Sequence, residues 1–387
     1  MSDRSPRIVI IAGEPSGDVL GARLMTALKR ATGGAVRLEG IGGEQMIGAG
    51  LKSRFPMGEL SHMGLVEVLP HLPLLLRRIR ETAAWLLSDP PDLLVTIDAP
   101  GFNVRLARRL KGRGIPLLHY VAPTVWAWKP RRAAAFARVF DHLLALLPFE
   151  PPYFTIHGLP CTYVGHPALE TMAGAPDGPG FRQRHGIAPT AKVICLLPGS
   201  RAFELRRLMP GFASAIRLIA QRQAGLHVIL PTVAPVAGMA EEGARACGVP
   251  VMVVSEPAEK RDAFAASDVA LAASGTVAVE LAVVGIPAVI AYRGHPITAA
   301  IVIRMVKIRY ASLINLLLDR RATPELLQQF CTPTAMAEAV DRLLSDPDAR
   351  AAQLAAYREA MAKLAVEGLP SERAAAVALS MIAARQP

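Results

Sequence analysis

The chain has 387 residues, of which 52% are hydrophobic and 19% charged, a composition that excludes intrinsic disorder and supports a large core. At about 100–200 residues per domain, this length favours two domains. The net charge of +11 favours an anionic partner, which could be nucleic acid, a phosphorylated substrate or a membrane face. An aromatic content of 5% and the lack of long basic runs disfavour nucleic acid.

Short apolar runs alternate with helical periods along most of the chain. This alternation is typical of parallel sheets covered by helices on both faces, so we expect an α/β fold. A Gly/Pro-rich segment, 173–180, divides the strands into two sets, and helices alone are expected after Thr332. The predicted strands are 8–12, 37–41, 93–97, 117–121 and 143–147, then 193–197, 227–230, 250–254, 269–272 and 287–291.

The first candidate loop follows the first strand and contains Glu14 and Ser16. Ligands of α/β sheets bind beyond the carboxyl ends of strands, and a helix N-terminus there suits an oxyanion or a hydroxyl. The loop is not a phosphate-binding P-loop, because no Lys-Ser/Thr pair follows its second glycine. A tight turn with Asp18 near the helix cap explains the same pattern.

Apolar residues recur at helical spacing between 65 and 86, beside Arg77, Arg78 and Arg80. An apolar face flanked by arginines suits a helix that lies on an anionic membrane surface. An ordinary core helix with a basic outer face would have the same pattern.

The loop after the third strand contains Asp98 and Asn103. A carboxylate at the end of a buried strand is partly desolvated, which raises its pKa and makes it usable as a general base. The alternative is an aspartate that caps the following helix.

The next loop, 119–129, contains Trp126, Trp128 and Lys129 and is followed by Arg131 and Arg132. Sugar rings pack on indoles, and phosphates pair with such bases. A hydrophobic plug would use the same tryptophans, so their role stays open at this point.

Two turns in the second half lead from a strand into a helix. The turn Gly199-Ser200-Arg201 offers backbone N–H groups and a permanent cation to a phosphate. The turn Ser274-Gly275-Thr276 opens another helix, and Glu280 lies one turn inside it. A carboxylate in so apolar a helix needs a partner, and either ribose hydroxyls or a structural hydrogen bond would supply one.

Other features point away from export, membrane spans and metals. The apolar run at the start ends at residue 12, so no signal peptide is expected, and the stretch 268–292 is interrupted by Glu280 and predicts strand–helix–strand rather than a span. The 9 histidines show no metal-ligand spacing, so we expect neither a metal nor a cofactor. Four scattered cysteines without a C-x-x-C pair fit a reducing cytoplasm: Cys161, Cys195, Cys247 and Cys331.

In this order the loops resemble those of the lipid A disaccharide synthases, bacterial glycosyltransferases that join two acylated glucosamines. The resemblance covers roughly residues 8–328, with Gly101 where the family often has Asp and Ile314 where it often has Pro. The matching stretches are AGEPSGD (12–18), MGLVEVLP (63–70), IDAPGFN (97–103), HYVAPTVWAWK (119–129), LPFEPPYF (147–154), VGHP (164–167), LPGSR (197–201), ASGTVAVELA (273–282) and ASLINLL (311–317).

The resemblance implies the GT-B fold, in which two Rossmann-like domains face each other across the active-site cleft. Residues 1–172 would face the acceptor and the membrane, 173–346 would bind the UDP-sugar, and helices in 347–387 would pack back on the first domain. It also implies inverting transfer from UDP-2,3-diacylglucosamine to 2,3-diacylglucosamine 1-phosphate. The product is the β-1′,6-linked disaccharide 1-phosphate, and UDP is released.

Applied to the loops described above, this reaction assigns roles to their residues, and the resemblance adds Asn315, Glu325 and Gln328. Asp98 would be the general base, and Arg77, Arg78 and Arg80 would face an anionic inner membrane to which the cytoplasmic protein binds peripherally. The nucleotide and its diphosphate would be bound by Gly199, Ser200, Arg201, Ser274, Gly275, Thr276, Glu280, Asn315, Glu325 and Gln328. The acceptor or its sugar would contact Glu14, Ser16, Asn103, Trp126, Trp128 and Lys129.

Three alternatives stay open. The first is another GT-B enzyme of UDP-sugars, either a UDP-N-acetylglucosamine 2-epimerase or the transferase of the peptidoglycan lipid pathway. The second is a nucleotide-sugar or lipid-binding module without catalysis, and the third is a nucleic-acid binder. The sequence leaves acyl-chain length and a homo-oligomeric state undecided.

Overall fold

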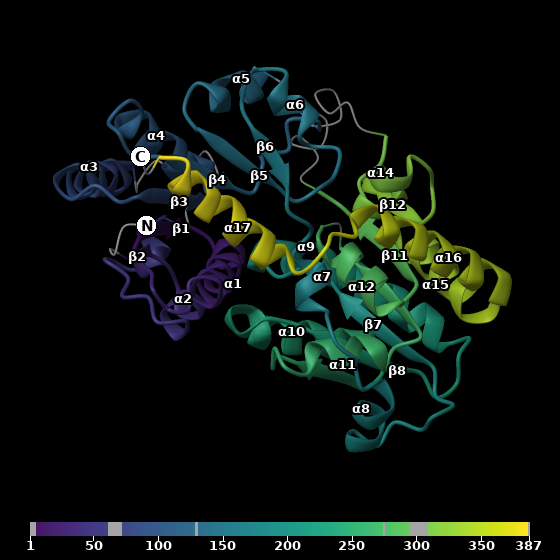
Figure 1. Cartoon of the computed structure of the whole chain (residues 1–387). Coiled ribbons are helices and arrows are strands. Elements are labelled where there is room, and N and C mark those ends of the chain that lie inside the picture. The colour runs from purple at the N-terminus through teal and green to yellow at the C-terminus, as the bar shows by residue number, and fades with distance from the viewer. Residues whose placement is uncertain (1–4, 61–71, 128–130, 274, 295–308, 386–387) are drawn as a thin grey trace. The chain divides into compact units, whose positions relative to one another are not determined.

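The chain folds into two compact units in the computed structural model, which describes residues 5–60, 72–127, 131–273, 275–294 and 309–385 (Figure 1). Unit 1 comprises Met1–Pro167 together with Val366–Pro387, and unit 2 comprises Ala168–Ala365. Each unit is an α/β structure with its own parallel sheet.

The sheet of unit 1 has six parallel strands in the order β2-β1-β3-β4-β5-β6. Successive residues of β1 point to opposite faces, so that Val9 and Ile11 share a core with α3 and α4 while Ile8 and Ile10 pack with α1 and α17. The strands are β1 (Arg7–Ala12), β2 (Arg37–Ile41), β3 (Leu93–Ile97), β4 (Leu117–Tyr120), β5 (His142–Ala145) and β6 (Cys161–Tyr163). The helices are α1 (Pro15–Ala31), α2 (Glu44–Gly48), α3 (Leu72–Ser88), α4 (Pro100–Leu110), α5 (Arg131–Ala137), α6 (Pro152–Thr155) and α17 (Pro370–Ala383).

The sheet of unit 2 also has six parallel strands, in the order β12-β11-β10-β7-β8-β9. Helices α9, α10 and α15 share one core with the sheet, and α8 and α11 share another. The strands are β7 (Val193–Leu197), β8 (His227–Pro231), β9 (Val251–Val254), β10 (Val269–Ala272), β11 (Ala288–Tyr292) and β12 (Glu325–Leu327). The helices are α7 (Ala168–Thr171), α8 (Gly178–Arg184), α9 (Ala202–Ala220), α10 (Ala237–Ala244), α11 (Lys260–Ala265), α12 (Val277–Val284), α14 (Leu313–Leu318), α15 (Pro333–Ser345) and α16 (Pro347–Leu364).

The two parallel sheets confirm the predicted α/β class, and all ten predicted strands are present with small shifts at their ends. The prediction missed β6 and β12, which have three residues each and are only half-buried. Edge strands this short carry too few apolar residues to form a recognisable run.

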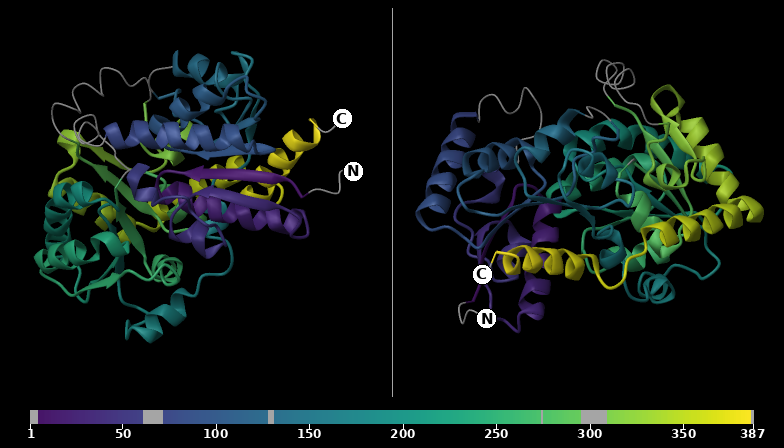
Figure 2. Two further views of the ribbon diagram at one scale, coloured as in Figure 1. Left: turned by 90° about the vertical axis from the view of Figure 1, so that its left-hand side faces the viewer. Right: turned by 45° about the horizontal axis from the view of Figure 1, so that its top comes forward.

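The C-terminal helices divide between the units, contrary to the expectation that residues 347–387 all pack on the first. Figure 2 shows α17 running beside α1, and its Ala374 and Ala378 join the core of unit 1. Helix α16 instead packs on α12, α14 and α15 of unit 2. Its buried Gln353 donates a hydrogen bond to the Ala288 carbonyl at the start of β11, 2.8 Å away, which fixes α16 to that sheet. Unit 2 begins at Ala168, five residues before the predicted boundary.

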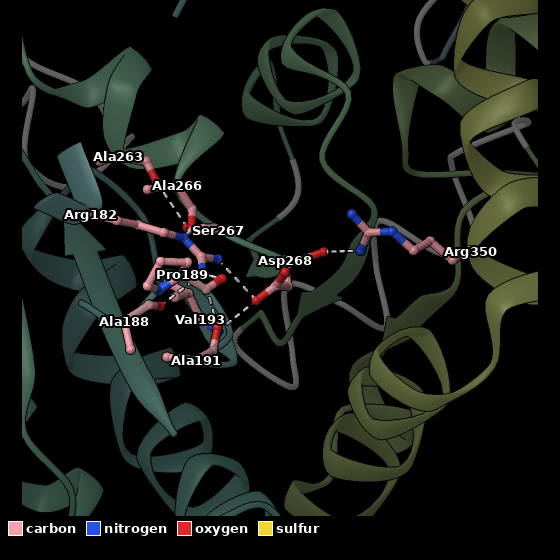
Figure 3. Close-up of polar contacts among 10 residues, drawn as sticks. All are labelled: Arg182, Ala188, Pro189, Ala191, Val193, Ala263, Ala266, Ser267, Asp268 and Arg350. Atoms are coloured by element: carbon pink, nitrogen blue, oxygen red, sulfur yellow. Dashed lines mark hydrogen bonds and ion pairs between the residues drawn. The ribbon is translucent and has the colours of Figure 1, made fainter. Parts of the chain in front are cut away.

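Arg182 of α8 ties together the amino-terminal ends of β7 and β10 in unit 2 (Figure 3). Its Nε donates to the Ala266 carbonyl at 2.8 Å, and its Nη2 lies 3.2 Å from Asp268 Oδ2. Asp268 also accepts the Val193 N–H at 2.8 Å. These groups lie at the sheet edge opposite to the carboxyl ends of the strands, so their role is to hold the unit together.

Candidate functional site

Four of the predicted loops lie where α/β sheets bind their ligands. The strand order changes direction between β1 and β3 in unit 1 and between β7 and β10 in unit 2. Ligands of such sheets bind beyond the carboxyl ends of the strands at this switch point. The loops after these four strands are those of Glu14, Asp98, Gly199–Arg201 and Gly275–Thr276.

Asp98 lies on a strained turn between β3 and α4. Asp98 and Ala99 have φ angles of 48° and 43°, a left-handed conformation that costs a non-glycine residue about 1–3 kcal/mol. The fully buried Asn103 stabilises this turn, because its Nδ2 donates to the carbonyls of Asp98 at 2.7 Å and Ile97 at 3.2 Å. Asn103 was predicted to contact the acceptor, and the structure shows that its amide group also holds the backbone beneath Asp98.

The loop of Glu14 packs directly against the turn of Asp98. A Cβ atom on Gly13 would lie 2.6 Å from Ala99 Cβ, so this close approach requires glycine. The loop itself places Glu14 in a buried position and leaves Ser16 exposed. Asp18 does not cap α1, the helix that this loop opens; its carboxylate accepts the N–H groups of Gly43, Gln45 and Met46 at 2.8–3.0 Å around the start of α2.

Trp126 is held by a buried carboxylate that the sequence analysis did not single out. Its Nε1 donates to Glu150 Oε1 at 3.1 Å, and its ring packs edge-on against Phe149. The other Glu150 oxygen accepts the N–H groups of Leu146 and Leu147, both at 3.0 Å. Burial raises the pKa of Glu150 to about 7, although these hydrogen bonds oppose the shift. The only feature of the sequence that pointed to Glu150 was its position as a single acidic residue between Phe149 and two prolines. Trp128 and Lys129 lie outside the described residues.

His119, at the end of β4, belongs to the core of unit 1. It is 1% exposed, stacks on Phe140 and lies with Nδ1 2.8 Å from Thr96 Oγ1. Burial lowers its pKa to about 3, so the ring is neutral at physiological pH. It is therefore unsuited to act as an acid or a cation.

In unit 2, the turn before α9 presents the predicted N–H groups, and a carboxylate already accepts them. Glu204 Oε2 lies 3.1 Å from the Ser200 nitrogen and 3.2 Å from the Arg201 nitrogen. Gly199 has a φ of 124°, and a Cβ there would lie 2.5 Å from the same oxygen. Arg201 is exposed, with Nη1 3.6 Å from Glu204 Oε1. The sequence analysis missed Glu204, although an acid three residues after the helix cap is a capping-box signal.

Glu280 pairs with a lysine from a neighbouring helix. Lys260 Nζ at the start of α11 lies 2.6 Å from Glu280 Oε2, and the Glu280 side chain is 16% exposed. Gly275 and Thr276 at the start of α12 are exposed, and Ser274 lies outside the described residues. The sequence analysis gave Glu280 no cation, because its partner lies 20 residues away.

Asn315 and Glu325, both predicted to contact the nucleotide or its diphosphate, are hydrogen-bonded to each other. Asn315 Nδ2 donates to Glu325 Oε1 and to the Thr323 carbonyl, both at 2.8 Å, and Asn315 Oδ1 accepts the N–H groups of Ala322 and Thr323. All four hydrogen-bonding positions of the amide are thus used. Glu325 also accepts the Ser312 N–H at 2.7 Å. These contacts fix the loop that leads into β12.

Gln328 follows β12 directly and has a φ of 53°. Its Oε1 accepts the Gly294 N–H at 3.2 Å, which joins the ends of β11 and β12. Of the three residues predicted after residue 310, Gln328 is thus the one that lies at the carboxyl ends of the strands.

The apolar stripe beside Arg77, Arg78 and Arg80 packs into the core of unit 1. Of its described members, Leu72 is half-buried, and Leu75, Ile79, Ala83 and Leu86 are buried. The alternative of a core helix with a basic outer face therefore holds for α3, whereas Leu65 and Val68 lie outside the described residues.

The three arginines of α3 differ in what they contact. Arg78 binds both carboxylate oxygens of Glu59, at 2.6 and 3.1 Å, and lies over Phe55. Arg77 is exposed and lies 3.6 Å from Glu81, and Arg80 is exposed. Arg77 and Arg80 are therefore better placed than Arg78 to meet an external anion.

The described residues contain neither a membrane-crossing helix nor a cluster of metal ligands. No helix among them has both the length and the hydropathy that a bilayer crossing requires. Within the same part of the chain, no three His, Cys, Asp or Glu side chains are grouped so as to hold a metal ion.

Comparisons with known proteins point in one direction. The sequence model of a family described as lipid-A-disaccharide synthetase matches residues 8–378. The lipid-A-disaccharide synthase of Rhodospirillum centenum is 52% identical over 98% of this chain and 95% of its own length. The enzyme of the same name from Paramagnetospirillum magneticum is 50% identical over 97% of both chains.

Solved structures similar to this chain share its fold at low sequence identity. The Staphylococcus aureus MnaA–UDP co-structure has a TM-score of 0.66 at 14% identity and covers 95% of this chain, with 94% of its own chain matched. Neisseria meningitidis UDP-GlcNAc 2-epimerase bound to UDP-GlcNAc has a TM-score of 0.64 at 11% identity, covering 98% of this chain and 100% of that one. The predicted GT-B fold is thereby confirmed.

Proposed function

The chain belongs to the lipid-A-disaccharide synthetase family, and on that premise we propose which of its residues carry out the transfer. It is a glycosyltransferase that joins UDP-2,3-diacylglucosamine to 2,3-diacylglucosamine 1-phosphate. The products are the β-1′,6-linked disaccharide 1-phosphate and UDP. Such a reaction needs a base for the attacking 6-hydroxyl and positive charge for the leaving diphosphate.

Asp98 is the proposed base. The observation that carries this role is the left-handed turn at residues 98–99, which a buried amide holds in place beneath the carboxylate. Backbone strain of this kind persists where the surrounding structure enforces it, and it is common at active sites. General-base assistance contributes typically about 10²–10⁴-fold to a rate.

The leaving diphosphate is proposed to bind at the N-terminus of α9. The N–H groups of Ser200 and Arg201 and the Arg201 guanidinium supply positive charge there, and the turn before α12 supplies further N–H groups. Glu280 is proposed to accept the ribose hydroxyls, with Lys260 fixing its carboxylate. Gln328 is the third proposed contact to the nucleotide, whereas Asn315 and Glu325 are proposed to shape its loop rather than touch it.

Both substrates carry acyl chains, so the enzyme has to work at a membrane surface. We propose peripheral binding to an anionic inner membrane, supported by the net charge of +11 and by the exposed Arg77 and Arg80.

A product assay with both acylated substrates tests the proposed function. The expected result is the disaccharide 1-phosphate with wild type and a 10²–10⁴-fold lower kcat, roughly, with Asp98→Asn at unchanged UDP affinity. Full activity of Asp98→Asn would exclude the base, and loss of both turnover and UDP binding would mean a structural aspartate. Consumption of UDP-diacylglucosamine without acceptor would favour an epimerase instead.

A further inference from the structure

A groove of about 250 Å³ in unit 1 is lined by residues that follow the proposed base. Pro100 and Gly101, the first residues of α4, line it and lie only two and three positions after Asp98 in the chain. Arg108 of α4 and Arg132 of α5 also line it, together with the apolar Phe136. None of the residues described as lining the groove is acidic.

Arg108 places a positive charge in this groove. Arg108 is exposed and makes no hydrogen bond or ion pair with any other described residue. Its neighbour Arg105 differs, because it donates to the Gly101 carbonyl of its own helix. A Cβ on Gly101 would meet only Arg105 Nη1, 3.9 Å away, so there is open space beside Gly101. The groove therefore presents the Arg108 guanidinium to whatever occupies it.

We propose that this groove binds the phosphate of the acceptor, an inference that rests on the proposed function. The acceptor carries its attacking hydroxyl on C6 and its phosphate on C1, and because C5 and C1 are both bonded to the ring oxygen, the two groups lie on the same edge of the sugar ring. With the hydroxyl at Asp98, the phosphate therefore lies close to the same turn, from which Pro100 and Gly101 line the groove. Guanidinium groups match a phosphate in geometry and charge, whereas an acyl chain gains nothing from them.

The groove also explains how the acceptor is oriented. A sugar bound through its 1-phosphate beside Asp98 presents its 6-hydroxyl to the base, because its other free hydroxyl, on C4, lies across the ring from C1. Arg108 and Arg132 are thus proposed to select acceptors that carry a 1-phosphate.

The test compares two acceptors, diacylglucosamine with and without its 1-phosphate, on wild type and Arg108→Gln. For the phosphorylated acceptor, Arg108→Gln is expected to lower kcat/KM about 10- to 100-fold, mainly through KM, because a charge-assisted hydrogen bond is lost. For the acceptor without phosphate, the two proteins are expected to be equal. Arg109→Gln is the matched control, since Arg109 is exposed on the same helix and does not line the groove.

Two results would overturn the proposal. One is an equal loss with both acceptors, which would point to acyl-chain binding or to a structural role. The other is an effect no larger than that of Arg109→Gln. The affinities of the two acceptors can also be measured by calorimetry without donor, so this measurement does not depend on turnover. If phosphate recognition depends on Arg108 while no disaccharide forms, the proposed function fails and the groove assignment stands.

Discussion

Glu204 Oε2 lies 3.1 Å from the backbone nitrogen of Ser200 and so accepts a hydrogen bond that the proposed diphosphate site needs. The same oxygen accepts the Arg201 N–H at 3.2 Å. The N-terminus of α9 therefore carries its own anion, and an incoming diphosphate has to displace it.

Removing the charge of Glu204 is expected to tighten UDP binding. In Glu204→Gln the side chain binds the Ser200 and Arg201 N–H groups more weakly and no longer repels the diphosphate. The expected gain in binding free energy is roughly 0.5–1.5 kcal/mol, or a decrease in the Kd for UDP of about 2- to 10-fold. Isothermal titration of UDP measures this change. Glu241→Gln, an exposed glutamate of α10, is the control for net charge. Weaker UDP binding would show that Glu204 acts only as a helix cap.

Glu150 is expected to make the stability of unit 1 depend on pH. Its folded pKa of about 7 lies above the usual value, so the folded protein binds the extra proton and is stabilised by it at low pH. This contribution, roughly 1–3 kcal/mol, is lost as the pH rises from about 4.5 through 7. Tryptophan fluorescence during urea unfolding measures it, because Trp85, Trp126 and Trp128 all belong to unit 1.

The control for this prediction is Glu150→Gln, which keeps the shape of the side chain but cannot ionise. At low pH the urea midpoint of Glu150→Gln is expected to be lower than that of wild type, because an amide cannot accept all the hydrogen bonds that Glu150 accepts. The midpoint of this variant is also expected to vary less with pH. An identical pH dependence in the two proteins would assign the effect to another group.

Replacing Asn103 by Ala is expected to reduce catalysis more than donor binding. Without its amide, the left-handed turn beneath Asp98 loses the hydrogen bonds that hold it, so the proposed base is no longer fixed in position. We expect kcat to fall about 10- to 100-fold with the KM for UDP-diacylglucosamine unchanged, and the protein to lose about 1–3 kcal/mol of stability. Steady-state kinetics measure the first effect and urea unfolding the second. Unchanged kcat in a destabilised protein would limit Asn103 to a structural role.

Arg182 is expected to matter for unit 2 far more than the nearby Arg184 does. The Arg182 side chain is 14% exposed, and Arg182→Ala leaves Asp268 and the carbonyl of the buried Ala266 without their cation, at a cost of about 3–5 kcal/mol. Arg184→Ala removes only ion pairs of a half-exposed side chain, and we expect less than about 1 kcal/mol. Calorimetric melting with and without UDP compares the variants. Equal losses would mean that the contacts of Figure 3 do not govern stability.

The exposed arginines of α3 are expected to contribute to membrane binding. Arg77→Gln with Arg80→Gln removes two positive charges, worth about 1 kcal/mol each near an anionic leaflet, so liposome affinity falls up to about 30-fold at low salt. Sedimentation with vesicles that contain anionic lipid measures this. The control is Arg109→Gln with Arg113→Gln, an equal charge change on exposed residues elsewhere in unit 1. Equal losses in both variants would assign binding to net charge rather than to α3.

The sequence predicted the strands and the loops after them because buried parallel strands are apolar runs and their ligand loops follow directly. It could not predict the partners of charged side chains, which are set by packing between distant segments. Lys260 with Glu280 and Arg78 with Glu59 are such pairs. Asn315 shows the same limit: its pattern indicated a ligand contact, while the fold uses its amide to bind Glu325.

The position of α17 in unit 1 has a consequence for how the protein is made. Unit 2 is one continuous segment, so it is complete when the ribosome has released Ala365. The face of the first sheet that carries Ile8 and Ile10 is covered by α1 and α17 together, so the part of this face under α17 stays exposed until that helix emerges. A nascent chain that stalls late in translation would therefore expose this face and become a substrate for chaperones, even though all its strands are already present.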